Sequence, residues 1–91
     1  MHVKYFAFFR DVTHEIKREW NQPAATVEDL LEQLSQHYGA SFEHRVFAAD
    51  GALSADVIIL VNGRHIQHLD GTHTLLKPDD TVSIFPVVAG G

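Results

Sequence analysis

The last residues of the chain, Gly90 and Gly91, carry the group with the most evident chemistry. Glycine has no Cβ atom, so a Gly-Gly end is thin and reaches backbone conformations that other residues avoid. Its distinctive group is the α-carboxylate of Gly91, which is anionic and unreactive until an enzyme activates it. We therefore predict that this end is the substrate of an activating enzyme. The alternative is a frayed terminus without a function, which is a common state of chain ends.

The sequence contains no cysteine. Disulfides, a cysteine nucleophile and cysteine-ligated zinc are therefore excluded. If the protein handles sulfur or an activated acyl group, it must do so on its own carboxyl end.

Histidine is the remaining candidate for a metal site or a catalytic dyad, because His65, His68 and His73 lie close together in the sequence. His65 and His68 are three residues apart in a predicted strand, so their side chains should point to opposite faces. No carboxylate at a suitable spacing completes a ligand set, and no Ser-His-Asp arrangement follows from the spacing. We predict no metal site and surface histidines.

The composition is that of one globular domain that folds without disulfides or metal. The chain has 91 residues, of which 45% are hydrophobic and 21% charged. Its formal net charge of −5 argues against nucleic acid or an anionic membrane as a partner. The sequence shows neither an apolar run of membrane-spanning length nor a secretion signal, so we expect a cytoplasmic protein.

Two strands are predicted at the start of the chain. Residues 2–9 are rich in aromatic and β-branched side chains, and alternation places Phe6 and Phe8 on the same face. Residues 10–13 form the predicted turn. Residues 14–20 are more polar and form a predicted strand at the edge of the sheet.

An amphipathic helix is predicted over residues 27–38, where apolar side chains recur at helical spacing. Thr26 is the expected N-cap, with Asp29 three residues later, and Gly39 is expected to end the helix. A short second helical segment is predicted over residues 40–47.

The second half of the chain predicts strands again. Residues 57–61 form a continuous apolar run of strand length, and Asn62-Gly63 directly after it is a strong hairpin signal. Residues 64–68 are the expected returning strand. Leu75 and Leu76 are expected to enter the core, and residues 81–85 form the final strand.

This order predicts an α+β fold of the β-grasp type, a mixed sheet of four to five strands with one main helix packed across one face. We expect a single domain over residues 1–91, in which residues 86–91 are a flexible tail. The first and last strands should lie parallel at the centre. The helix-free face would then carry Phe6, Phe8 and Phe85 as a docking patch for another protein. A register shift of one residue would instead turn these rings into the core.

With these features, the chain resembles the small subunits of molybdopterin synthases, and more widely the ubiquitin-like sulfur carriers. The likeness spans nearly the whole chain. The matching pieces are Tyr5-Phe6-Ala7 before Arg10, the helix start at 26–30, Val61-Asn62-Gly63, and the end at 82–91. The most specific piece is the Phe-Pro-x-Val-Ala-Gly-Gly pattern over residues 85–91.

The resemblance implies a non-catalytic, sulfur-donating subunit of a transferase complex. An adenylyltransferase of the ubiquitin-activating type would use ATP and magnesium to adenylate Gly91, and a persulfide donor would convert the adenylate into a thiocarboxylate. The large subunit would receive this tail and pass the sulfur to cyclic pyranopterin monophosphate. No permanently bound cofactor and no metal are implied.

The resemblance also assigns roles to residues. Gly91, preceded by Gly90, would be the adenylate and thiocarboxylate site. The partner-binding residues would be Phe6, Phe8, Arg10, Phe85, Pro86, Val87, Val88 and Ala89. Many members have a second proline after the one at position 86, and Gly-Asp where this chain has Asp79-Asp80.

These departures leave the pathway open. The same carboxylate chemistry could serve thiamin thiazole, cysteine or tRNA thiolation. A different class of function is a protein modifier whose Gly91 is joined to a lysine of a target protein. The remaining alternative is a plain interaction domain whose Gly-Gly end is incidental.

Overall fold

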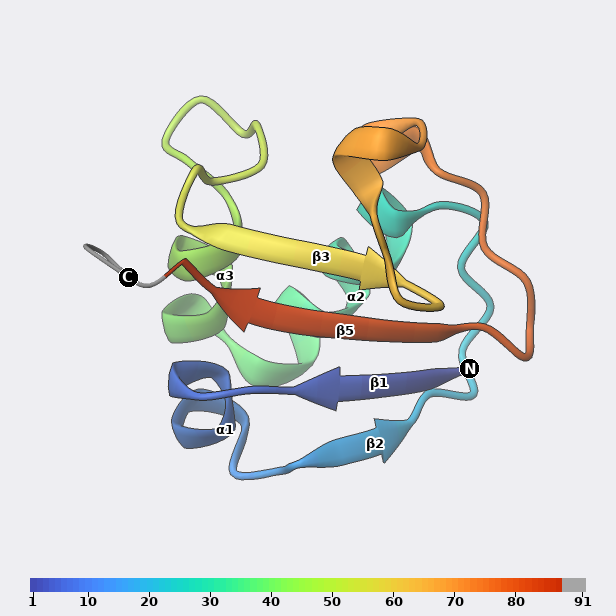
Figure 1. The fold of residues 1–91 in the computed structure, drawn as a ribbon. Helices are drawn as coiled ribbons and strands as arrows, with labels where there is room; N and C mark the ends of the chain where they lie inside the picture. The colour runs from blue at the N-terminus through green and yellow to red at the C-terminus, as the bar shows by residue number, and fades with distance from the viewer. Residues whose placement is uncertain (88–91) are drawn as a thin grey trace.

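The protein folds around a five-stranded mixed sheet. The computed structural model describes residues 1–87, and residues 88–91 lie outside the described part. The strands are β1 (His2–Tyr5), β2 (Lys17–Glu19), β3 (Val57–Val61), β4 (Arg64–His65) and β5 (Thr81–Pro86). Their order is β2-β1-β5-β3-β4; β1 and β5 are parallel, and the other pairs are antiparallel (Figure 1). The predicted parallel pair at the centre of the sheet is confirmed.

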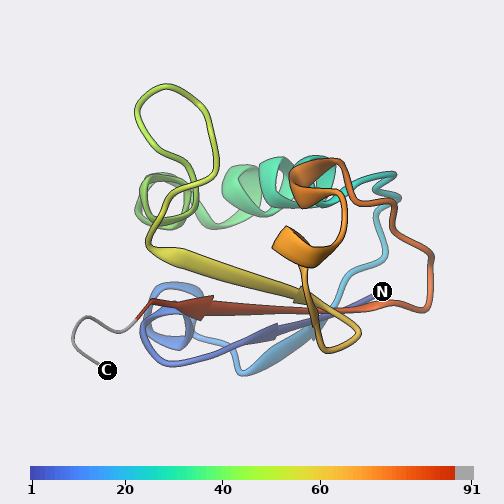
Figure 2. The same ribbon diagram turned by 45° about the horizontal axis from the view of Figure 1, so that its top comes forward.

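The described residues form three α-helices, two of which form a layer over one face of this sheet (Figure 2). The helices are α1 (Phe8–Thr13), α2 (Val27–Tyr38) and α3 (Ala40–Val46), with the 3₁₀ turns η1 (Ile66–His68) and η2 (Gly71–His73). Helices α2 and α3 lie over the same face of the sheet (Figure 2), whereas α1 lies beyond the end of β1 (Figure 1). The α+β fold class predicted from the sequence is confirmed.

Helix α2 has the bounds that its apolar spacing predicts. The Thr26 side-chain oxygen accepts a hydrogen bond from the Asp29 backbone N–H at 3.2 Å, which satisfies one of the free donors at the helix start. At the other end, the Gly39 N–H donates to the Ser35 carbonyl at 2.8 Å. Gly39 has a φ of 95°, a left-handed value that glycine adopts without strain.

The core lies between α2, α3 and the inner face of the sheet. It is formed by Val3, Tyr5, Phe9, Trp20, Val27, Leu30, Leu31, Leu34, Phe42, Val46, Val57, Ile59, Val61, Ile66, Val82 and Ile84. Aromatic rings fill the end next to α1, where Phe42 packs edge-on against Phe9 at 5.7 Å and against Tyr5 at 6.5 Å between ring centroids. Edge-to-face packing of this kind adds to the free energy gained by burial.

The first strand is shorter than the sequence predicts. Strand β1 ends at Tyr5, and the residues expected to continue the strand and then to turn form helix α1 instead. The chain turns at Ala7, whose φ of 51° and ψ of −124° match the first central position of a type II′ turn, closed by the Phe9 N–H donating to the Phe6 carbonyl. Glycine usually occupies this position, so the sequence carries no signal for the turn. The second strand is also shorter than predicted, but it does lie at the sheet edge.

The hairpin after β3 forms at Asn62-Gly63, as predicted. Both residues have positive φ, 52° and 84°, as a two-residue type I′ hairpin loop requires. The Asn62 side chain fixes the start of β5, because its Oδ1 accepts from the Thr81 N–H and its Nδ2 donates to Asp80 Oδ1, each at 2.9 Å.

The returning strand contains only two residues, because the chain enters η1 at Ile66. This corrects the expectation that His65 and His68 point to opposite faces of a strand. Their rings instead meet edge-to-face at 6.0 Å.

Leu75 does not enter the core. Its side chain is 75% exposed, whereas Leu76 is partly buried against the core. An isolated antiparallel bridge between Thr26 and Leu75 holds this segment extended beside the start of α2. Successive side chains of an extended segment alternate in direction, so only one of the two leucines can face inward.

Among residues 1–87, no helix is long and apolar enough to cross a membrane.

Candidate functional site

The most distinctive surface feature is a stacked pair of phenylalanines at the end of the two central strands. Because β1 and β5 are parallel with Tyr5 opposite Ile84, the residues that follow, Phe6 and Phe85, lie side by side. Their rings stack with centroids 4.1 Å apart and planes 9° apart. Along β5, Val82 and Ile84 are buried while Phe85 is half-buried, so the stack lies on the face turned away from α2.

Arg10 extends this surface with a positive charge. Its guanidinium carbon lies 5.3 Å from the centre of the Phe6 ring, and its Nε donates to the Tyr5 carbonyl at 2.8 Å. Helix α1 places Arg10 there because the turn at Ala7 changes the direction of the chain at the end of β1. Within the described residues, Arg10 makes no ion pair with a carboxylate. The terminal guanidinium nitrogens are therefore available to an acidic group of another molecule.

Phe8 does not join this surface. It lies on α1, where its ring packs against Phe9, and the guanidinium carbon of Arg45 from α3 lies 4.1 Å from its centroid. The predicted patch of three rings on one strand face is thus corrected to the Phe6–Phe85 stack with Arg10. We name these three residues the aromatic docking surface.

The segment predicted to be a tail begins inside the sheet. Pro86 is the last residue of β5 and lies opposite Val57. The Val87 N–H then donates to the Asp56 carbonyl at 2.9 Å, and the Val87 side chain is 45% exposed. The predicted site residues Val88, Ala89, Gly90 and Gly91 lie outside the described residues. The aromatic docking surface therefore lies at the base of the segment that leads to Gly91.

The aromatic docking surface offers binding and no catalytic group. The two stacked rings can bind an apolar side chain of a partner, and the guanidinium beside them can bind an acidic side chain next to it. A stacked phenylalanine pair and a guanidinium supply no general base or nucleophile at neutral pH.

Behind this surface, two tyrosines form a hydrogen-bonded chain. The Tyr5 hydroxyl donates to the Tyr38 hydroxyl at 2.9 Å, and the Tyr38 hydroxyl donates to the Glu15 carboxylate. Arg18 pairs with the same carboxylate at 3.2 Å. Burial, followed by the hydrogen bond to Tyr38, raises the pKa of Tyr5 above its ordinary value. Burial, followed by the hydrogen bond to Glu15, raises the pKa of Tyr38.

These pKa shifts predict a loss of stability at high pH. Below the unfolded-state pKa of about 10, both phenols are protonated in the folded and unfolded states alike. Above it, unfolded tyrosines lose protons that the folded ones retain, so the free energy of unfolding falls as pH rises. We expect tyrosinate absorbance to appear only together with the loss of the far-ultraviolet circular dichroism signal.

The variant Tyr38→Phe serves as the control, because the buried Tyr5 should still titrate only on unfolding. Tyrosinate absorbance that rises near the ordinary tyrosine pKa in a fully folded protein would contradict this prediction.

Comparison with known proteins gives one family. Residues 3–91 match the model of the ThiS family. Small archaeal modifier protein 3 of Haloferax volcanii is 38% identical over 92 residues, which cover 100% of this chain and 98% of that protein.

Solved structures share the fold over nearly the whole chain. The solution structure of small archaeal modifier protein 1 from Methanosarcina acetivorans has a TM-score of 0.87 and 31% identity, with 99% of this chain and 94% of that chain covered. A Pyrococcus furiosus protein described as a putative molybdopterin converting factor, subunit 1, has a TM-score of 0.75 and 35% identity, with coverages of 96% and 95%. The sheet order and the helix layer are thus those of ubiquitin-like β-grasp proteins.

Proposed function

Because the chain belongs to the ThiS family of ubiquitin-like sulfur carriers, we propose that its Gly91 carboxylate is the group that carries sulfur. The observation that supports this most directly is the aromatic docking surface at the base of the segment leading to Gly91. A carrier needs a partner that holds its body while its end reaches an active site. Phe6, Arg10 and Phe85 offer the surface for that contact.

The proposed chemistry begins with activation of Gly91. An adenylyltransferase binds ATP and magnesium, and the Gly91 carboxylate attacks the α-phosphorus while pyrophosphate leaves. A persulfide sulfur then attacks the acyl carbon, and AMP leaves with the electron pair of the cleaved C–O bond. A thiol cleaves the resulting S–S bond, and a thiocarboxylate remains on Gly91. The chain has no cysteine, so the persulfide and the thiol both belong to partners.

In its finer form, the proposal makes this chain the small subunit of a molybdopterin synthase. The large subunit would bind the aromatic docking surface, and the segment from Pro86 to Gly91 would enter its active site. There the thiocarboxylate would give its sulfur to cyclic pyranopterin monophosphate. The Phe85-Pro86 pair before the Gly-Gly end supports this assignment. So does the likeness to the Pyrococcus furiosus protein.

A protein modifier is the second candidate. The relatives from Haloferax volcanii and Methanosarcina acetivorans are named small archaeal modifier proteins. In this reading, the same adenylate of Gly91 is attacked by a lysine amine of a target protein, and an isopeptide bond forms. The two candidates share the activation step and differ in the nucleophile that follows it.

The test is the intact mass of the full chain after incubation with the adenylyltransferase, ATP, magnesium, a persulfide donor and a thiol. We expect a mass gain equal to the exchange of one oxygen for sulfur. Deletion of Gly91 should abolish the gain without changing the thermal unfolding midpoint. A chain that gains no sulfur while its Gly91 adenylate forms would overturn the sulfur-carrier proposal.

The finer assignment is tested by adding the large subunit and cyclic pyranopterin monophosphate to the thiocarboxylated chain. Reversion to the original mass with dithiolene formation supports the molybdopterin role. Isopeptide-linked Gly91 on lysines of other proteins, with no sulfur transfer to the pterin, would favour the modifier.

A further inference from the structure

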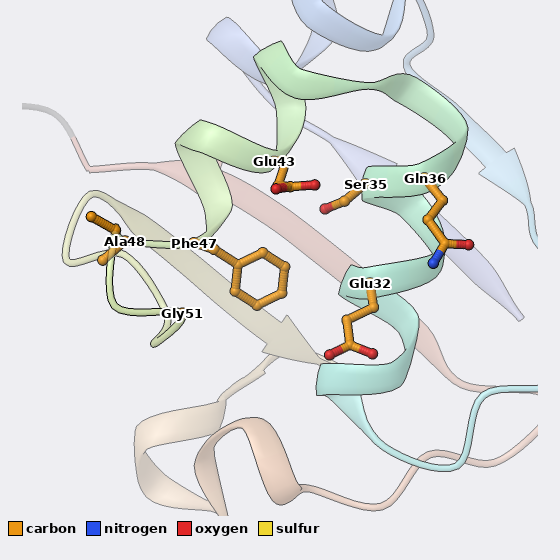
Figure 3. A pocket seen from close by; sticks show the side chains of 8 residues that line it. Glu32, Ser35, Gln36, Glu43, Phe47, Ala48 and Gly51 are labelled. Atoms are coloured by element: carbon orange, nitrogen blue, oxygen red, sulfur yellow. The ribbon is translucent and has the colours of Figure 1, made fainter.

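A second site lies on the helix side of the molecule. Helices α2 and α3 and the loop after α3 enclose an open cavity of about 370 Å³. Side chains of Glu32, Ser35 and Gln36 from α2 line it, together with Glu43 and Phe47 from α3 and its C-cap (Figure 3). We name these five residues the acidic pocket. It lies over the sheet face opposite the Phe6–Phe85 stack, so the two surfaces can bind different molecules at once.

The buried hydroxyl of Ser35 is the most telling feature of the acidic pocket. Ser35 is 4% exposed, and its Oγ has no hydrogen-bond partner among the described residues. Figure 3 shows the Ser35 hydroxyl and the Glu43 carboxylate pointing toward each other across the pocket. A buried polar atom without a partner destabilises the fold, so it needs a physical explanation, and a bound cation or ligand that completes its hydrogen bonding is one.

The acidic pocket also carries negative charge that nothing in the described structure neutralises. Glu32 and Glu43 are exposed carboxylates from two different helices, and among residues 1–87 neither forms an ion pair. The chain as a whole has a formal net charge of −5. Both the local and the overall charge therefore favour a cationic ligand.

We propose that the acidic pocket binds the ammonium group of a lysine side chain of a partner protein. An ammonium donates N–H groups, which match the acceptors on Glu43 and Ser35, and the Glu32 carboxylate adds a second negative charge to the same pocket (Figure 3). The alkyl stem of the lysine would lie along the Phe47 ring, the apolar wall of the pocket. Binding thus gives the Ser35 hydroxyl its missing partner.

Other cations fit the acidic pocket less well. Calcium takes six to eight oxygen ligands, and magnesium prefers an octahedral shell, whereas two carboxylates on a half-apolar wall offer neither. A guanidinium is planar and pairs best with one carboxylate side-on, whereas the polar groups of this pocket come from two different helices. The proposal does not depend on the sulfur chemistry of Gly91.

The test uses the full, isotope-labelled chain and the probe Nα-acetyl-lysine N-methylamide, followed by nuclear magnetic resonance. We expect saturable amide shifts confined to residues 32–36 and 43–47, with a dissociation constant in the millimolar range because one side chain makes few contacts. The norleucine analogue has the same stem without the charge and should cause no shifts.

Variants then separate specific binding from general attraction. The double variant Glu32→Gln/Glu43→Gln should weaken probe binding about tenfold or more, since it removes both negative charges that line the pocket. Ser35→Ala should weaken it several-fold while the protein stays folded. The matched control is Glu19→Gln/Asp79→Asn, which removes the same charge from two exposed positions outside the pocket and should leave the affinity unchanged.

Three results would overturn the proposal. Equal loss of affinity in both double variants would mean diffuse attraction to an acidic protein. Shifts scattered over the molecule, or absent at saturating probe, would mean that the pocket binds no lysine. Calcium or spermidine that occupies the pocket when the lysine probe does not would assign it to a metal ion or a free polyamine.

Discussion

Replacing Phe85 with aspartate should lower the affinity for the proposed partner roughly a hundredfold or more, because it would place a charge in the proposed contact, from which water is excluded. The substitution also removes one ring of the Phe6–Phe85 stack, whose centroids are 4.1 Å apart. The new carboxylate would lie close to Arg10 and compete for the guanidinium that the aromatic docking surface offers to the partner. Isothermal titration calorimetry against the proposed partners, an adenylyltransferase and a molybdopterin synthase large subunit, measures this loss.

The matched control is Leu75→Asp. Leu75 is an apolar side chain with 75% exposure outside the aromatic docking surface, so the same charge there should leave the affinity unchanged. Phe85→Leu should retain part of the affinity, because it keeps an apolar side chain but loses the stacked ring. If the folded Phe85→Asp variant binds the proposed partner with unchanged affinity, Phe85 is not part of a docking surface.

Replacing Phe42 with alanine should lower the free energy of unfolding by about 4 kcal/mol, the usual cost of deleting a buried aromatic ring. Phe42 is fully buried and packs against Tyr5, Phe9 and Tyr38. A domain of this length has a total stability of roughly 5–14 kcal/mol, so much of it would be lost. Urea unfolding followed by circular dichroism gives the free energy directly.

Phe47→Ala is the control for Phe42→Ala, because Phe47 is only partly buried and lines the acidic pocket. Its removal leaves no closed cavity and should cost about 1 kcal/mol. If the two variants unfold at the same urea concentration, the aromatic cluster around Phe42 contributes less to the free energy of unfolding than its burial implies.

The sequence predicts well those elements whose signals are local. Helix α2 combines an apolar stripe with a capping threonine and a terminal glycine, and its bounds agree with the prediction. Strand β3 and the Asn62-Gly63 turn also agree with the prediction. At the turn, asparagine and glycine are the residue types that its positive φ angles favour. The order of these elements was sufficient for the fold class.

The prediction fails where tertiary packing overrides the local pattern. The residues after Tyr5 alternate like a strand, yet the chain turns at Ala7 because α1 must bring Phe9 into the core against Phe42. An alanine at this position gives no turn signal, so the sequence predicts a strand for residues 8 and 9, which belong to helix α1. The same alternation predicts the wrong surface for Phe8, whereas Phe6 and Phe85 lie side by side as predicted because β1 and β5 are parallel.

The acidic pocket had no sequence signal that would stand out. Glu32 and Glu43 are ordinary surface residues of two amphipathic helices, and Ser35 looks like a small residue on the inner side of α2. Only the packing of α2 against α3 brings them together. A search for such pockets could have used one pattern: a serine at a buried helical position, with carboxylates three residues before it and eight residues after it.

The central position of β5 has a consequence for how the protein is made. In the described sheet, β5 alone connects the β2–β1 ribbon to the β3–β4 ribbon, and it is the last of these strands to leave the ribosome. Two-stranded ribbons are marginally stable in water, so the nascent chain cannot close its sheet before residues 81–86 emerge. Copies interrupted before β5 would expose unpaired strand edges. Because unfolded chains are triaged by chaperones and proteases, such copies would not compete with complete ones for the proposed partner.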